Sequence, residues 1–530
     1  MIRLRQINVN VLEDSKEKLI EKCSKKLRIN SKEIKDIEIV KKSIDARKKP
    51  DLFYSYEVNI VVNAEEKIIS KLISNDIFIV NEKKYEFKIT GEKKLFKRPI
   101  IVGSGPAGLY CAYMLAQNGY KPIIIERGKD VDSRILDVKK FWETGVLDKN
   151  SNVQFGEGGA GTFSDGKLNT LVKDNNNRQK KVLEIFVESG APSEILYENK
   201  PHIGTDILTS VVKNIRKKII SMGGEFRFDT CLTNIKYENG FVKSIIVNNS
   251  EEIETDVLVL AIGHSARDTF KMLYDLKLNM KSKPFAVGIR IEHPQKLINK
   301  SQYGVEKHAI LPNASYKLTH KALNGRGVYT FCMCPGGYVV NSSSEENMLA
   351  INGMSNYKRD TENANSAVIV TISPNDFSDN VMSGVEFQRN LEKKAYSLCN
   401  GKIPVQLYGD FKANQISTKF GTIKPIFKGN YEFGNIRTIF PNYINDALID
   451  GIEAFSKKIK NFNCDDAIIA GVESRTSSPI RIQRDEFGES NIKGIYPIGE
   501  GAGYAGGITS AAIDGIIAAE NIAKVYKVNQ

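Results

Sequence analysis

Three glycines and one glutamate stand at a spacing that suits the binding of a dinucleotide. Gly103, Gly105 and Gly108 form a G-x-G-x-x-G turn, and Glu126 follows about 20 residues later. Gly103 permits a tight turn, Gly105 lets the backbone approach a pyrophosphate, and Gly108 lets a helix pack against a strand. The carboxylate of Glu126 can accept hydrogen bonds from both hydroxyls of an adenosine ribose, which argues against a ligand with a 2′-phosphate.

Residues 98–128 also contain the elements that must position this turn. They predict a buried strand, the glycine turn, a helix and a second strand that ends at Glu126. The free N–H groups and the dipole at the start of the helix favour a phosphate there. Two further G-x-G-x-x-G matches, at 156–161 and 501–506, lack the complete unit, so the sequence predicts one nucleotide-binding βαβ fold.

A second glycine-rich stretch, residues 156–166, is too irregular for a helix or strand. Its backbone N–H groups could approach an anionic or planar ligand closely. The stretch lies where flavoproteins wrap a second loop around their cofactor, and Ser164 and Asp165 are the candidate polar contacts. A flexible loop without a ligand is the alternative interpretation.

Two later segments extend the flavoprotein pattern. Main-chain groups near 230–232 are expected beside the adenine, and Gly263 ends a buried strand where the chain would pass the cofactor. His264 is either a base or, together with Arg267, a residue that orients this turn. At the C-terminus a strand, Glu500, a glycine turn and a long helix from Ile508 follow one another. Glu500 can accept a hydrogen bond from a ribityl hydroxyl, and the helix N-terminus can stabilise negative charge on a reduced flavin.

Together these motifs resemble the glutathione-reductase-like FAD/NAD(P)-binding superfamily, and in detail the FAD-dependent (NAD(FAD)-utilising) dehydrogenases of unassigned substrate. The resemblance covers nearly the whole chain and is carried by GSGPAGLYCA, FGEGGAGTFSDGKL, LAIGHSARDTF, KPFAVGIRIEHP, FCMCPGG, NGMSNYKRD, GVESRTSSPIRI and YPIGEGAGYAGGI. It implies FAD and redox chemistry but no substrate, and Glu500 stands where Asp is common. The residues expected to contact FAD are Gly103, Gly105, Pro106, Ala107, Gly108, Glu126, Arg127, Gly158, Gly159, Gly161, Thr162, Ser164, Asp165, Leu232, Gly263, Gly499, Glu500, Gly506, Gly507 and Ile508.

The predicted fold class is α/β. A three-layer FAD-binding Rossmann-like domain spans residues 96–283 and 471–530, and an α+β substrate domain is inserted at 284–470. Residues 1–95 predict a small ferredoxin-like βαββαβ module whose last strand is 85–90.

The inserted segment is expected to cover the isoalloxazine ring and to contact the substrate. Cys332 and Cys334 could exchange electrons with a flavin, although residues one apart on a strand point to opposite faces and a disulfide between them needs a distorted backbone. The weak catalytic candidates are Cys332, Cys334, His264, Glu473 and Arg475. An anionic substrate or a structural ion pair could explain each of the arginines Arg290, Arg359, Arg475 and Arg481.

The overall composition of the chain bears on the kind of protein that carries these motifs. The 530 residues are 41% hydrophobic, no apolar run could span a bilayer, and no signal sequence is visible. The seven cysteines form no zinc-ligand pattern and suit a cytoplasmic protein without a metal site. Residues 1–98 carry 24 Lys and Arg against 16 Asp and Glu, which suggests a solvated basic surface or, less readily, a nucleic-acid partner.

The sequence therefore predicts an FAD-dependent oxidoreductase that passes hydride between flavin N5 and a small molecule, with NADH or NADPH as a transient donor. Three alternatives stay open: a flavin monooxygenase, a reductase of carbon–carbon double bonds, and a non-enzymatic flavin redox sensor or assembly factor whose basic N-terminal module binds a partner.

Overall fold

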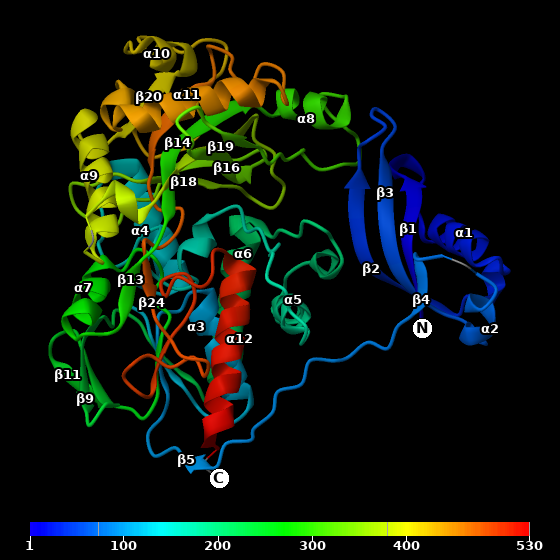
Figure 1. Cartoon of the computed structure of the whole chain (residues 1–530), viewed down its shortest axis with the longest axis horizontal. Helices are drawn as coiled ribbons and strands as arrows, with labels where there is room; N and C mark the ends of the chain where they lie inside the picture. The colour runs from blue at the N-terminus through cyan, green and yellow to red at the C-terminus, as the bar shows by residue number, and fades with distance from the viewer. Residues whose placement is uncertain (73, 379, 529–530) are drawn as a thin grey trace.

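The computed structural model describes residues 1–72, 74–378 and 380–528. Figure 1 shows a small module at the N-terminus, drawn in blue, beside a larger body that contains the rest of the chain. Residues 80–92, which form no helix or strand, run along the underside of that body to β5 (Lys93–Lys94). There β5 pairs with β26 (Tyr526–Lys527), so the start of the body lies beside the C-terminal end of the chain.

A parallel sheet of five strands organises the lower part of the body. The strands are β6 (Ile100–Val102), β7 (Ile123–Ile125), β8 (Glu225–Arg227), β12 (Leu258–Leu260) and β25 (Ile495–Pro497), in the order β25-β12-β6-β7-β8. Ile100 lies opposite Ile123 on one side and Leu258 on the other. Four of the five strands are almost continuously apolar, as expected for a parallel sheet that is covered on both faces.

The two faces of this sheet pack against different layers. Ile101, Ile124 and Val259 join the apolar cluster formed by the helices α3 (Pro106–Gln117), α5 (Arg178–Glu188), α6 (Gly204–Ser221) and α12 (Ile508–Val525). Their neighbours Ile100 and Ile123 join the cluster of the antiparallel strands β9 (Leu232–Glu238), β10 (Phe241–Val247) and β11 (Glu251–Glu254) and of α7 (Arg267–Asp275). The strand–turn–helix–strand unit predicted at 98–128 is present, and Asn239-Gly240 joins β9 to β10 in a hairpin.

The inserted segment forms a seven-stranded sheet in the order β15-β16-β19-β14-β23-β20-β22. Its strands are β14 (Phe285–Pro294), β15 (Thr319–Lys321), β16 (Gly327–Cys334), β19 (Asn363–Ile372), β20 (Ile403–Leu407), β22 (Tyr431–Phe433) and β23 (Ile468–Glu473). A smaller sheet joins β17 (Tyr338–Asn341), β18 (Ile351–Met354) and β21 (Phe427–Lys428). The covering helices include α8 (Gln295–Tyr303), α9 (Ser383–Leu398), α10 (Tyr408–Ala413) and α11 (Asn442–Ser456).

The inserted sheet and the parallel sheet are joined by a short ribbon. It consists of β13 (Met280–Ser282) and β24 (Ile480–Ile482), which run antiparallel where the chain enters and leaves the insertion. The helix α4 (Val131–Thr144) lies between these parts, and its Val138 packs against Val340 and Met354 of the smaller inserted sheet.

The N-terminal module has the predicted order of elements but not the predicted last strand. Its elements are β1 (Ile2–Asn10), α1 (Lys16–Leu27), β2 (Asp36–Asp45), β3 (Phe53–Val61), α2 (Glu65–Ile69) and β4 (Ile77–Ile79), and the sheet order is β2-β3-β1-β4. The strand predicted at 85–90 is wrong. That segment instead lies along α12, where the Tyr85 hydroxyl donates to Glu520 and the Thr90 N–H donates to the Ala523 carbonyl.

The module contacts the body through its edge strand β2. The Lys42 N–H donates to the Tyr197 carbonyl at 2.7 Å, and the Asn199 N–H donates back to the Lys42 carbonyl at 2.9 Å. Lys42 is itself held by an ion pair with Asp14 at 2.8 Å. The segment 197–199 thus continues the sheet of the module, immediately before Lys200.

Within the part of the chain that the structure describes, no helix combines the length and the apolar character that crossing a bilayer would require.

Candidate functional site

A cavity of about 500 Å³ lies between the parallel sheet and the inserted sheet. Val102, Ile125 and Ala261 line it, so it opens at the carboxyl ends of β6, β7 and β12. This edge is where open parallel sheets bind their ligands. The opposite wall includes Thr330 and Met333 of the inserted strand β16.

Most of the residues predicted to contact the cofactor line this cavity. They are Gly103, Gly105, Pro106, Ala107, Glu126, Arg127, Gly159, Gly161, Ser164, Asp165, Leu232, Gly263, Gly499, Glu500, Gly506, Gly507 and Ile508. The catalytic candidates Cys332, His264, Glu473 and Arg475 line it as well. Segments far apart in the sequence are therefore brought to one continuous space.

Four predicted site residues lie behind the wall instead. A Cβ at Gly108 would collide with the carbonyl oxygen of Gly103, so this glycine lets α3 pack against the turn. Gly158 adopts a φ of +86°, and the buried Thr162 hydroxyl donates to the Glu157 carbonyl at 3.4 Å. Cys334 is fully buried. These residues can act on a ligand only by shaping the loops in front of them.

Gly105, Gly506 and Gly507 lie at the front of the cavity and are called the glycine cradle below. They leave room that the protein itself does not fill. A Cβ at Gly105 would meet nothing closer than the Gly159 Cα at 3.8 Å, and one at Gly506 would meet nothing within 4 Å. Gly105 precedes α3 and Gly507 precedes α12, so two helix N-termini begin at this space. Free N–H groups and a positive helix end suit the pyrophosphate and the electron-rich ring of a flavin dinucleotide. The residues present therefore fit FAD.

Glu126 occupies the predicted position but is already saturated with hydrogen bonds. Its Oε2 accepts from the Ser104 N–H at 3.0 Å and hydroxyl at 2.8 Å, and its Oε1 accepts from the N–H groups of Gly128 and Gly156 at 3.0 and 3.1 Å. Besides facing the cavity, the carboxylate therefore ties the two glycine loops together. A ribose hydroxyl would have to share these acceptors.

Arg134 organises the second glycine loop, and the sequence analysis missed it. Its fully buried guanidinium donates to five carbonyls, those of Asn152, Val153, Gly156, Glu157 and Gly159, at 2.7–3.2 Å. Burial lowers its pKa to about 10. A signal was present, because Arg134 lies on the same face of α4 as the buried residues Val131, Val138 and Phe141.

Asp165 forms a buried cluster with two cations. Its carboxylate accepts from the Ser355 hydroxyl and the Arg359 guanidinium, and it pairs with Lys167 Nζ at 2.9 Å. Although burial opposes ionisation, Lys167 and Arg359 hold the pKa of Asp165 down at about 2. Next to this cluster the His202 ring stacks on Tyr357, with centroids 5.5 Å apart. Burial and then Arg359 lower the pKa of His202 to about 4.

His264 and Glu500 face one another at the cavity. His264 Nδ1 lies 3.4 Å from Glu500 Oε2. The other ring nitrogen, Nε2, is buried and meets no hydrogen-bond partner among the described residues. This arrangement lets the pair hold one proton between them. Arg267, which was predicted to orient this turn together with His264, instead points into a separate ion-pair network described below.

The two cysteines differ in exposure because the strand is distorted between them. Cys332 has a φ of +40°, where the register of β16 against β19 shifts, and its side chain is exposed. The buried Cys334 thiol donates to the Cys332 carbonyl at 3.2 Å. Both thiols are free, and burial raises the pKa of the Cys334 thiol. The reactive thiolate form is therefore disfavoured at Cys334.

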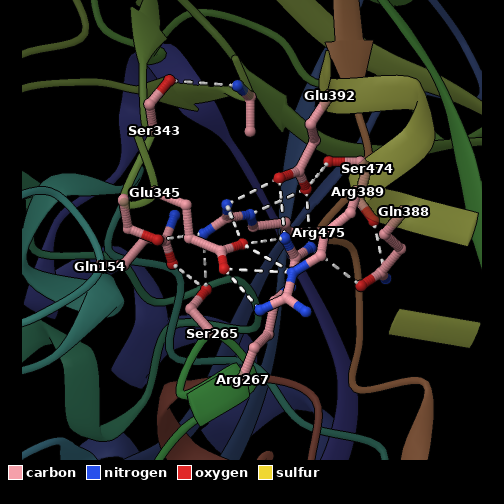
Figure 2. A network of polar contacts seen from close by, with 12 residues as sticks. Gln154, Ser265, Arg267, Ser343, Glu345, Gln388, Arg389, Glu392, Ser474 and Arg475 are labelled. Carbon is pink, nitrogen blue, oxygen red and sulfur yellow. Dashed lines mark hydrogen bonds and ion pairs between the residues drawn. The ribbon is translucent and has the colours of Figure 1, made fainter. Parts of the chain in front are cut away.

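Arg267, Arg389 and Arg475 meet Glu345 and Glu392 in one network at the side of the cavity (Figure 2). Arg475 donates to both carboxylate oxygens of Glu392, at 3.0 and 2.8 Å, and to the hydroxyls of Ser265 and Ser344. Arg389 binds Glu345 at 2.7 Å. The network fixes Arg475 rather than leaving it free for a substrate.

The other three candidate arginines also have partners within the protein. Arg290 is fully buried and pairs with Glu473 at 2.8 Å, which neutralises that carboxylate, while Arg359 binds Asp165. Arg481 donates to the Gly503 carbonyl at 3.1 Å and lies over the Tyr504 ring. The sequence left two explanations open for these arginines, an anionic substrate or a structural ion pair. The geometry favours a structural role, because each arginine has a partner within the protein.

Three lysines that the sequence analysis did not single out line the far end of the cavity. They are Lys167, Lys200 and Lys317, near Ser315 and Tyr316. Nothing in the sequence distinguishes them from the many surface lysines, because they come from segments that only the fold brings together.

The parallel sheet, the glycine cradle at its carboxyl edge and the inserted sheet above it define an FAD-binding protein with a Rossmann-like domain. Family models match three parts of the chain: "FAD-dependent protein, C-terminal domain-like" at residues 284–476, "NAD(P)-binding Rossmann-like domain" at 101–144, and "Domain of unknown function (DUF8436)" at 1–61. An uncharacterized protein of Clostridium beijerinckii is 49% identical over 531 residues, which cover 99% of each chain. The chain belongs to the same family as this relative.

Solved structures with a similar arrangement are more distant. A variant of the quinol fumarate reductase FrdA of E. coli is 11% identical over 81% of this chain and 70% of its own, with a TM-score of 0.36. The flavin-dependent brominase Bmp2 is 14% identical over 81% and 78%, with a TM-score of 0.36. CtdE in complex with FAD is 12% identical over 80% and 83%, with a TM-score of 0.31. Family membership therefore follows from the sequence matches alone.

Proposed function

We propose that this protein is an FAD-dependent oxidoreductase of the dehydrogenase or reductase type that acts on a small molecule. Bound FAD would supply the redox chemistry, the transfer of a hydride to or from flavin N5. The observation that carries the proposal is the continuity of the cavity, which runs from the cradle at Gly105 to the inserted strand β16 at Thr330. A dinucleotide bound in the cradle would leave the opposite wall of the cavity, at β16, free to contact a substrate.

The chain's own residues would perform three tasks around the cofactor. The N-termini of α3 and α12 present N–H groups and a positive helix end to negative charge. His264, with Glu500 at 3.4 Å, can hold or release a proton at Nδ1. The inserted sheet forms the opposite wall of the cavity and would shield a bound flavin from water on that side.

The absorbance spectrum of the purified protein tests this proposal, first in air and then anaerobically while NADH or NADPH is added. We expect a flavin spectrum that bleaches with one of the two nucleotides or with a substrate. A Gly105→Ala variant should carry less flavin at unchanged fold. Protein that binds no FAD even after reconstitution would refute the proposal, and flavin that no nucleotide or substrate reduces would favour a sensor.

The electron donor belongs to the same proposal. The residues that the structure describes contain one complete nucleotide-binding βαβ unit, at β6, α3 and β7. A nicotinamide nucleotide would therefore bind transiently in the cavity. Rapid reoxidation by O₂ of flavin reduced in the presence of a substrate, with incorporation of oxygen into that substrate, would identify a monooxygenase instead.

A further inference from the structure

We infer that the end of the cavity formed by the inserted sheet binds an oxyanion, a carboxylate or phosphate group of the reacting molecule, through Lys200 and Lys317. The inference rests on the proposed function, because it assigns a substrate class to the same cavity. It follows from the charges that line this end, from their lack of partners and from their position relative to the cofactor cradle.

Positive charge exceeds negative charge at this end of the cavity. Lys167, Lys200, Lys317 and Arg359 line it, together with the carboxylate of Asp165. Asp165 is shared between Lys167 at 2.9 Å and Arg359. The other carboxylate nearby, Glu473, is already neutralised by Arg290 and adds no compensation.

Two of these cations have no carboxylate of their own. Lys200 Nζ reaches only the Ser315 hydroxyl, at 3.4 Å. Within the described parts of the chain neither Lys200 nor Lys317 forms an ion pair. Burial, with Arg359 and Lys167, lowers the pKa of Lys200, as expected where a positive charge faces other positive charges. An oxyanion at this point would satisfy both ammonium groups.

The position of these cations matches that of a substrate anchor. The Gly161–Lys167 loop begins against α12, because a Cβ at Gly161 would lie 3.1 Å from the Ile508 side chain. It ends at Asp165 and Lys167, beside Arg359. The cationic end therefore lies near the N-terminus of α12, in the same cavity as the cradle, and a molecule anchored there would extend toward the cradle. Neutral donors such as Asn169 and Ser315 line the same end.

Isothermal titration of the full-length, FAD-loaded protein tests the inference with defined probes. Inorganic phosphate and succinate represent the two oxyanions, and NADPH tests whether the phosphates of a nucleotide donor are the natural occupants. We expect at least one probe to bind to the wild type. A double variant, Lys200→Gln with Lys317→Gln, should weaken that binding by about tenfold or more, because two charged hydrogen bonds are lost.

Two controls keep the result specific. Lys321→Gln removes an exposed lysine of β15 that does not line the cavity, so binding should stay within about twofold. Lys200→Arg with Lys317→Arg keeps the charges and should retain most of the binding even if the glutamine variant folds poorly. Weakened binding of succinate, but not of phosphate or NADPH, would identify a carboxylate substrate, and the reverse would identify a phosphate.

The inference is overturned if no oxyanion binds to the wild type, or if the glutamine double variant binds as tightly as the wild type. Neither outcome touches the proposed function, which is judged by the flavin spectrum and its reduction. Conversely, protein that cannot be loaded with FAD would defeat the proposed function, while titration of the same protein with phosphate and succinate would still decide the charge-based inference.

Discussion

Arg267 and Glu392 form a bidentate ion pair in which both side chains are almost completely buried. Arg267 Nη1 lies 2.8 Å from Glu392 Oε2, and Nη2 lies 2.7 Å from Oε1. The same carboxylate accepts two hydrogen bonds from Arg475. Since Arg267 begins α7 of the nucleotide-binding part and Glu392 lies on α9 of the insertion, the pair joins the two walls of the cavity.

We predict that Glu392→Ala lowers the free energy of unfolding by about 3–5 kcal/mol, because two buried guanidinium groups lose their bidentate partner and Glu345 alone must compensate three arginines. The two arginines hold the pKa of Glu392 well below its ordinary value, so the carboxylate is ionised at neutral pH. Glu386→Ala, an exposed ion-pair partner on the same helix, should change the stability by less than about 1 kcal/mol. Urea denaturation measures both, and equal effects would contradict the prediction.

A pair of glycine variants separates the cofactor cradle from the packing of the fold. Gly105→Ala places its methyl group in open space, so we expect nearly unchanged stability of the FAD-free protein but weaker FAD binding. Gly108→Ala collides with the Gly103 carbonyl and should destabilise that protein by about 1–3 kcal/mol. FAD titration and thermal unfolding of the FAD-free proteins decide the matter. Full FAD affinity in Gly105→Ala would show that the ligand does not approach this turn.

Arg134→Met should release the second glycine loop. Five backbone carbonyls lose a charged donor, so we expect a loss of about 3 kcal/mol or more and new protease cleavage between residues 150 and 160. Lys139→Met, an exposed change on the same helix, should leave the cleavage pattern as it is. Limited proteolysis followed by mass spectrometry detects the difference. An intact loop in Arg134→Met would mean that Glu126 alone is sufficient to order it.

The half-buried His202 predicts a specific dependence of stability on pH. Its pKa is about 4 in the folded protein, below the ordinary 6.5, so it stays neutral while the unfolded chain takes up a proton. Stability is therefore lost as the pH falls below about 6.5, by about 2 kcal/mol between pH 7 and pH 5. His202→Phe keeps the ring stacked on Tyr357 but removes the proton. Urea denaturation at both pH values should show a correspondingly smaller loss in this variant, and equal losses would refute the assignment.

The nucleotide-binding half of the fold could be predicted because its signals are local. Gly103 and Gly108 each have a steric reason that can be read from the turn itself, and the strand before them is apolar because both of its faces are covered. The strand predicted at 85–90 failed for the opposite reason. Its alternating pattern suits a strand, but residues 77–79 already pair with β1, and Tyr85 and Thr90 bind α12 instead.

The site was only partly predictable. Most of the residues predicted to contact the cofactor line the cavity, but Lys200 and Lys317 acquire a shared role only when distant segments meet. Sequence could not show that Glu126 would accept four hydrogen bonds from its own loops, or that Cys332 would adopt a positive φ. Arg134 is the exception, since an arginine on the apolar face of a predicted helix already indicates a buried charge with partners.

The two hydrogen bonds between Lys42 and the 197–199 segment give the N-terminal module a thermodynamic connection to the cavity. Lys200 follows that segment directly, so the backbone that carries this lysine is held by a strand far away in the sequence. Linkage is reciprocal. If docking of the module strengthens the binding of an anion at Lys200, then an anion bound at Lys200 strengthens the docking of the module by the same factor. The free energy that holds residues 1–79 against the body is thus a quantity that an occupant of the cavity can change.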